Sequence, residues 1–198
     1  RIPTQEDLEV ITKINKNNQL PKQSLEVGNV RNFNTPGWGI SSFDGLFSNR
    51  QGNVLQILLE NIQKEQKQLC FSEEYNKSIS TYLSILFDKI ICRNTSFGVW
   101  HKLQETVEHP FGRQAIPMVF DYPEMNPFSS LSGGCYGQLQ SIIDYIENEK
   151  SFAANCNNLI SGDKNQFEEK AITCVVTDPP YYDAIAYADL SDFFYVWL

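Results

Sequence analysis

Several features that would mark a common class of protein are missing from this sequence. Its five cysteines are odd in number and scattered, and no two of them form a CxxC pair. The positions are Cys70, Cys92, Cys135, Cys156 and Cys174. We therefore expect no disulfide framework and no metal site, and thiols that stay reduced in the cytoplasm.

Long apolar runs are missing too. No stretch approaches the roughly 20 apolar residues of a membrane-spanning helix, and the first residues lack the apolar core of a signal peptide. We expect a soluble, cytoplasmic protein with no membrane partner. Hydrophobic residues still make up 41% of the 198 residues, and aromatic residues 13%, which is enough for a folded core.

An excess of positive charge is also lacking. The net charge is −8, and it is unevenly divided along the chain. Residues 1–114 hold 13 Lys and Arg against 12 Asp and Glu, whereas residues 115–198 hold 3 against 12. Any neutralisation of nucleic-acid phosphates must therefore come from the first part, or from protein outside this chain.

Apolar residues at helical spacing predict helices through much of the chain. One of these helices should begin with a capping box, Ser48-x-x-Gln51, and pack against the next as a hairpin. Its partner should begin after a cap at Ser72. The stripe Leu190, Phe193, Phe194 and Trp197 is expected to be helix core. The predicted helices span residues 5–16, 49–69, about 73–94, 137–150 and 184–198.

Strand signals are fewer, and together with the helices they predict an α/β fold. Residues 115–120 form a strand-like run, and residues 158–162 predict a short strand. The run Ile172–Thr177 is apolar and bounded by turn residues, which is typical of a fully buried strand in a parallel sheet.

The stretch TDPPYYD, residues 177–183, stands at the end of that last predicted strand. The Asp178 carboxylate and the Pro179 carbonyl can accept hydrogen bonds from the two hydrogens of an exocyclic amine. We expect that carbonyl to be free because Pro180 follows it. Tyr181 offers a ring on which an extruded base can stack. Such groups act by positioning and electrostatics more than by proton transfer.

Asp178-Pro179-Pro180-Tyr181 after a strand resembles motif IV of the S-adenosylmethionine-dependent amino-methyltransferases, which act on adenine N6 or cytosine N4. The longer string from 177 to 198 is similar to a narrower group, the adenine-specific DNA methylases that contain a DUF1156 domain. Other stretches that match this group are GWG at 37–39, LFSNRQ at 46–51, FGRQAIPM at 111–118 and DYPEMNPF at 121–128. The resemblance covers roughly residues 37–198.

The resemblance implies adenine N6 methylation of a flipped base in DNA, with S-adenosylmethionine as the methyl donor. RNA as substrate, or cytosine N4 as target, stays open. It also implies part of a Rossmann-like methyltransferase sheet with a mostly helical insertion. We divide the chain accordingly into a polar, partly irregular segment (1–35), a mostly helical substrate-side region (36–150) and a partial methyltransferase core carrying the DPPY motif (151–198).

The Gly-rich turn with which this family binds its cofactor has no counterpart here. The one Gly pair, Gly133-Gly134, follows no predicted strand. We therefore expect a middle fragment, inactive in isolation, whose main cofactor loop comes from the remainder of the same polypeptide or from a partner subunit. The alternative is a non-catalytic base-binding or scaffold subunit of a defence or restriction complex.

Other residues are candidates for supporting roles. Pro180, Tyr182, Asp183 and Tyr187 are candidates for the base pocket. Asp163 is a candidate for the adenosine part of the cofactor, with a surface turn as the alternative. Arg113 and Gln114 are candidates for nucleic-acid contact, with a buried scaffold pair as the alternative. For the remaining polar candidates, His101, His109, Asp121 and Glu124, a structural role is the preferred interpretation.

Overall fold

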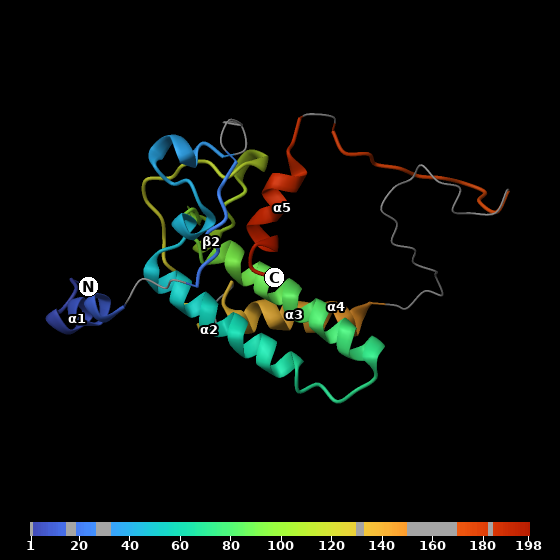
Figure 1. The fold of residues 1–198 in the computed structure, drawn as a ribbon, viewed down its shortest axis with the longest axis horizontal. Coiled ribbons are helices and arrows are strands. Elements are labelled where there is room, and N and C mark those ends of the chain that lie inside the picture. The colour runs from blue at the N-terminus through green and yellow to red at the C-terminus, as the bar shows by residue number, and fades with distance from the viewer. Residues whose placement is uncertain (1, 15–18, 27–32, 130–132, 150–169, 182–183) are drawn as a thin grey trace.

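The structure is a computed structural model that describes residues 2–14, 19–26, 33–129, 133–149, 170–181 and 184–198 (Figure 1). The described part contains both helices and a small sheet. In chain order the elements are α1 (Gln5–Lys13), the 3-10 helices η1 (Thr35–Trp38) and η2 (Phe43–Leu46), α2 (Asn49–Gln66), α3 (Glu73–Arg93), β1 (Val99–His101), β2 (Thr106–Glu108), η3 (Gly112–Gln114), α4 (Cys135–Asn148) and α5 (Tyr187–Tyr195).

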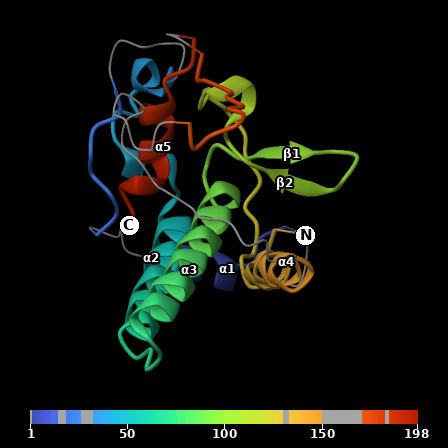
Figure 2. The ribbon, with the colours of Figure 1, turned by 90° about the vertical axis from the view of Figure 1, so that its right-hand side faces the viewer.

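Helices α2 and α3 form the predicted hairpin and lie side by side in Figures 1 and 2. The capping box at the start of α2 is confirmed. Ser48 Oγ accepts from the Gln51 N–H at 3.2 Å, and Gln51 Oε1 accepts from the Ser48 N–H at 2.9 Å. Ser72 caps α3 through the Tyr75 N–H, as predicted. These local bonds satisfy donors that a helix start leaves without partners.

Helix α5 closes one end of the hairpin, and aromatic side chains make the contact. The ring of Phe193 is stacked on that of Phe47 at 5.9 Å, and Trp197 meets Phe47 edge-on at 5.1 Å. Phe193 is 0% exposed and Trp197 is 5% exposed, so the prediction that this stripe belongs to the core is confirmed. The same core also takes in residues from the first part of the chain, among them Leu20, Leu25 and Phe33.

The chain around Leu25, before α2, packs in this core and pairs with the chain that precedes η2. Ser24 and Ser42 form an isolated antiparallel bridge, and the Leu25 N–H donates to the Ser41 carbonyl at 2.9 Å. The segment also reaches α5, where the Glu26 carboxyl contacts Asp189. A hydrogen bond to Asp189, then burial and the charge of that neighbour, raise the pKa of Glu26.

The predicted strands are wrong where the structure describes them. Ile172–Thr177 is irregular, and Val175 and Val176 are 72% and 92% exposed, so it is not a buried strand. Residues 115–120 pair only through one isolated bridge, Phe33 to Ile116. No described strand lies beside either run, and a β-prone segment without a hydrogen-bonding neighbour gains nothing from being extended. The strand predicted at 158–162 lies outside the described residues.

The sheet that does form was not predicted. β1 and β2 pair as an antiparallel hairpin, with Trp100 opposite Val107. Figure 2 shows it projecting beside the end of α3. A Rossmann-like parallel sheet is not confirmed, because the described residues contain only these two strands. Within the same residues, no helix is both long and apolar enough to cross a membrane.

Phe193 supplies the first test of this packing. Phe193→Ala should lower the free energy of unfolding by about 3–5 kcal/mol, because the cavity would open between α5 and the hairpin. Tyr195→Ala is the matched control on the same helix, since Tyr195 is 76% exposed. Urea unfolding followed by circular dichroism measures both. Equal, small effects would mean that α5 is not part of the core in solution.

Asp88, on α3, supplies the second test. Its Oδ1 is buried, and no described residue hydrogen-bonds it. Burial raises the pKa of this carboxyl from 3.8 to about 6. The folded state therefore binds the Asp88 proton more tightly than the unfolded state does. The resulting contribution to the free energy of unfolding is complete below about pH 4 and is lost as the pH rises through about 6.

Asp88→Asn should remove the loss of stability that Asp88 causes as the pH rises. Half of the group is exposed, so solvent screening leaves an effect of about 1 kcal/mol in favour of the variant at pH 7, shrinking toward pH 4. Urea unfolding of both proteins across this pH range measures the difference in their free energies of unfolding. The contributions of the other carboxyls are the same in both proteins and cancel. A variant less stable than its parent at pH 7 would show that the Asp88 carboxylate has a stabilising partner.

Candidate functional site

A cleft of about 760 Å³ lies where the turn around η3 meets the DPPY motif and α5. The DPPY motif forms one wall, the turn around η3 a second, and α5 together with Ile185 a third. This volume is within the usual range for small-molecule sites, about 300–1,000 Å³. Its lining is Phe111, Gln114, Asp178, Pro179, Pro180, Tyr181, Ile185, Tyr187, Leu190, Ser191 and Phe194.

Phe111 fixes the position of η3 against α5. Its ring is stacked on Phe194 at 5.5 Å and meets Phe193 edge-on at 5.2 Å. Aromatic pairs in such geometries add about 0.5–1.5 kcal/mol beyond the area that they bury. The apolar floor of the cleft is therefore built from rings that also belong to the core.

The DPPY residues present their polar groups to solvent on the cleft's open side. Asp178, Pro179 and Pro180 are exposed, and the Tyr181 ring is 63% exposed. None of the described residues forms an ion pair with Asp178 or donates a hydrogen bond to the Pro179 carbonyl. Within the described residues neither acceptor has a partner, and their role in holding an amine stays a prediction.

Two of the supporting candidates join the motif in the cleft. Gln114 ends η3 with a φ of +60°, a left-handed conformation that is uncommon for a residue with a side chain and that clusters at functional sites. Tyr187 begins α5 and is about half exposed. Both side chains line the cleft, so residues 64 positions apart, Gln114 and Asp178, share one site.

The other candidates are not brought to this site by the described structure. Tyr182, Asp183 and Asp163 lie outside the described residues. Arg113 belongs to η3, but only its backbone is described.

Glu124 has a structural partner. Its carboxylate forms an ion pair with Arg50 and accepts from Ser48 Oγ at 2.6 Å. This carboxylate therefore ties the loop at 121–128 to the start of α2, and Asp121 remains an exposed residue near it. His101 Nδ1 accepts from the Gln104 N–H at 3.1 Å, which holds the turn between β1 and β2. The structural interpretation fits both Glu124 and His101.

The sequence predicts only part of the cleft. It indicates Phe111 as part of a motif, and Leu190 and Phe194 as helix core. The signal was present: Tyr187, Leu190, Ser191 and Phe194 follow the i, i+3, i+4, i+7 spacing of one helix face. This face belongs to the helix that begins six residues after Tyr181, and in the structure it lines the cleft beside DPPY.

The chemistry of this lining suits a flat molecule that carries an amino group. Rings and aliphatic side chains can cover its faces, while one carboxylate and one carbonyl can accept its N–H groups. Among the described residues, the cleft's lining contains no lysine, arginine or glycine. These residues fit an aromatic amine, and the described lining does not by itself form a site for S-adenosylmethionine.

A scan against protein-family models and searches of curated proteins and of solved structures found no match to this chain.

Proposed function

We propose that the cleft binds the target base of an amino-methyltransferase, adenine in DNA, for methylation at N6. The observation that carries the proposal is the meeting of Asp178, Pro179 and Tyr181 with Gln114 and Tyr187 in one largely apolar cleft. The resemblance of DPPY to motif IV supplies the reaction. In this proposal the chain contributes the substrate side of a Rossmann-like methyltransferase.

The two acceptors position the exocyclic amine of the base. An exocyclic amine on an aromatic ring is a poor nucleophile, because its lone pair is delocalised into the ring. Hydrogen bonds from its two N–H groups to the Asp178 carboxylate and the Pro179 carbonyl favour a pyramidal nitrogen with a localised lone pair. In this proposal the bound base holds both acceptors in place, so that they cost little reorganisation when charge develops.

Tyr181 and the aromatic floor hold the base itself. A base turned out of a duplex loses its stacking on both faces, which costs a few kcal/mol. The exposed ring of Tyr181 can restore one of these contacts, and Phe111 and Phe194 provide an apolar surface beneath. Gln114 carries an amide donor and an acceptor that can read a base edge.

S-adenosylmethionine is the proposed source of the methyl group, as an electrophilic methyl sulfonium. Its main binding loop is proposed to come from further polypeptide or from a partner subunit.

The competing hypothesis is a non-catalytic base-binding or scaffold subunit that uses the same cleft. Calorimetric titration of the full-length protein with S-adenosylmethionine separates the two, since the scaffold requires no cofactor. Absence of binding would overturn the enzyme proposal.

Asp178→Ala in the full-length protein should reduce methyl transfer to DNA by about 100- to 1000-fold, because one preorganised acceptor is lost. The fold should be unchanged, since Asp178 is exposed. Transfer of a labelled methyl group to adenine-containing DNA measures the effect. Asp192→Ala, at an exposed carboxylate of α5 outside the cleft lining, is the control. Activity within a few-fold of the parent would mean that another group holds the amine.

Tyr181→Phe should keep most of the activity and Tyr181→Ala should lose it, because stacking requires the ring and not the hydroxyl. The expected loss for the Ala variant is about 1–3 kcal/mol of base binding. Binding of a DNA strand with an extruded adenine, measured by fluorescence anisotropy, reports this directly. A Phe variant as impaired as the Ala variant would assign the role to the hydroxyl.

A further inference from the structure

A second, smaller pocket of about 300 Å³ lies behind the candidate base cleft. It is formed where α3 meets α4 and the chain that follows β2. Its lining is Lys89, Cys92, Arg93, His109, Phe111 and Gln138. Three of these six side chains carry nitrogen groups that are or can become cationic, in a chain with a net charge of −8.

The two α3 cations in this pocket have no acidic partner among the described residues. Lys89 Nζ donates to Ser141 Oγ at 2.8 Å and keeps two further N–H groups. Arg93 Nη1 donates to the Val107 carbonyl, which leaves the other guanidinium donors available. Both side chains are half-buried, so their charges are less screened than those on an open surface.

Arg93 is also held in place from the other side. Gly133 has a φ of +97°, and a Cβ added to it would lie 2.8 Å from Arg93 Cδ. Glycine is the residue that permits both this left-handed backbone and this close approach. The Gly133-Gly134 pair thus lets the Arg93 stem pack against the chain that leads into α4.

Gln138 is the third polar side chain of this pocket. The residue is only 8% exposed, and no described residue hydrogen-bonds its side-chain amide. The amide is not among the buried polar atoms that lack a partner, so its atoms can be reached from the pocket. An oxygen-rich ligand would give the amide nitrogen an acceptor.

The remaining lining does not oppose an anion. Burial raises the pKa of the Cys92 thiol to about 12, with the charge of Asp88 adding to the rise and that of Arg93 opposing it, so the thiol stays neutral. Asp88 itself does not line the pocket. Lys89, Arg93 and the Gln138 amide are therefore the polar groups an anion would meet, beside His109.

Phe111 lines both this pocket and the base cleft, so the two cavities are neighbours that share this residue. In a polynucleotide, a phosphate is joined to its base through a single sugar. Sites for the two groups must therefore lie close together. The described walls of the cleft include no cation, and the second pocket offers two, Lys89 and Arg93.

We propose that Lys89, Arg93 and Gln138 bind a backbone phosphate of the polynucleotide whose base occupies the DPPY cleft. This inference rests on the proposed function, because it takes the base cleft as its reference point. Two charged donors and one neutral donor suit the oxygens of a phosphodiester. Free phosphate presents the same oxygens, and the test separates the two sources.

Lys89→Gln in the full-length protein should weaken binding of an adenine-containing single-stranded DNA by about threefold to tenfold near 0.1 M salt. It should also reduce the slope of log K against log salt by about 0.7, the loss of one phosphate contact. Lys89→Arg should keep both values close to the parent. Fluorescence anisotropy across a salt series measures them. Unchanged affinity and slope in Lys89→Gln would overturn the proposal.

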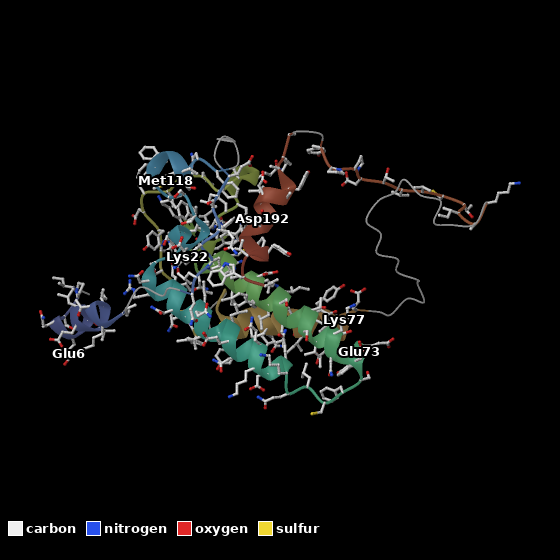
Figure 3. The ribbon with its side chains drawn as sticks, in the orientation of Figure 1. Glu6, Lys22, Glu73, Lys77, Met118 and Asp192 are labelled. Carbon is white, nitrogen blue, oxygen red and sulfur yellow. The ribbon has the colours of Figure 1, made fainter. Side chains whose placement is uncertain are left out.

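Lys77→Gln is the matched control, because it makes the same change on the same helix at an exposed position. Figure 3 shows Lys77 at the end of α3 that lies away from α5. It should leave affinity and slope unchanged. If Lys77→Gln weakens binding as much as Lys89→Gln, the effect is general charge and the pocket is not a specific site, which also overturns the proposal.

Two further measurements separate this proposal from its alternatives. Deoxyadenosine, which has no phosphate, should bind the parent and Lys89→Gln equally. Inorganic phosphate that binds the parent while the DNA strand does not would identify a free-phosphate site and overturn the proposal. If the parent transfers methyl groups and Lys89→Gln binds DNA as well as the parent does, the phosphate site is overturned and the proposed function stands. If Lys89→Gln binds DNA more weakly and the parent transfers no methyl group, the phosphate site is supported and the enzyme proposal is overturned.

Discussion

Helix α5 is held against the α2–α3 hairpin by contacts between aromatic rings, and the candidate cleft depends on this attachment. Trp197 meets Phe47, which lies between η2 and α2, at 5.1 Å, and it meets Phe87 of α3 at 5.7 Å. Phe193 extends the same cluster to Phe111. The last helix of the chain is therefore fixed on elements formed more than a hundred positions earlier. A cleft whose wall is α5 exists only while these rings remain packed.

Charge is distributed in a way that complements this arrangement. The cleft belongs mainly to the acidic second part of the chain, and its lining offers acceptors for an amine. The second pocket draws its cations from α3, in the part of the chain whose charges nearly balance. Phe111 separates the two environments. An amine and a phosphate of one ligand would thus each meet groups of suitable polarity, without placing Lys89 or Arg93 beside Asp178.

Local sequence signals predicted the helices well, and they failed where structure depends on distant partners. Ser48 and Gln51 cap α2 with bonds that span three residues, so their pattern is sufficient. The Ile172–Thr177 run has the composition of a buried strand, yet a strand also requires a neighbour to pair with, which composition cannot supply. The DPPY motif predicted Asp178 and Tyr181 as site residues. Phe111 and Gln114 could be assigned to the same cleft only after the rings of α5 placed η3 beside it.

The location of Trp197 gives the protein an optical reporter. Of the three tryptophans, Trp38 and Trp100 are 59% and 49% exposed, whereas Trp197 is 5% exposed among the rings of Phe47 and Phe87. An indole shielded from water emits at shorter wavelength than one in contact with it. The short-wavelength part of the intrinsic fluorescence therefore belongs to the residue that holds α5 in place. Its red shift would register detachment of that helix, and with it disassembly of the cleft, as a signal distinct from the helicity of the α2–α3 hairpin.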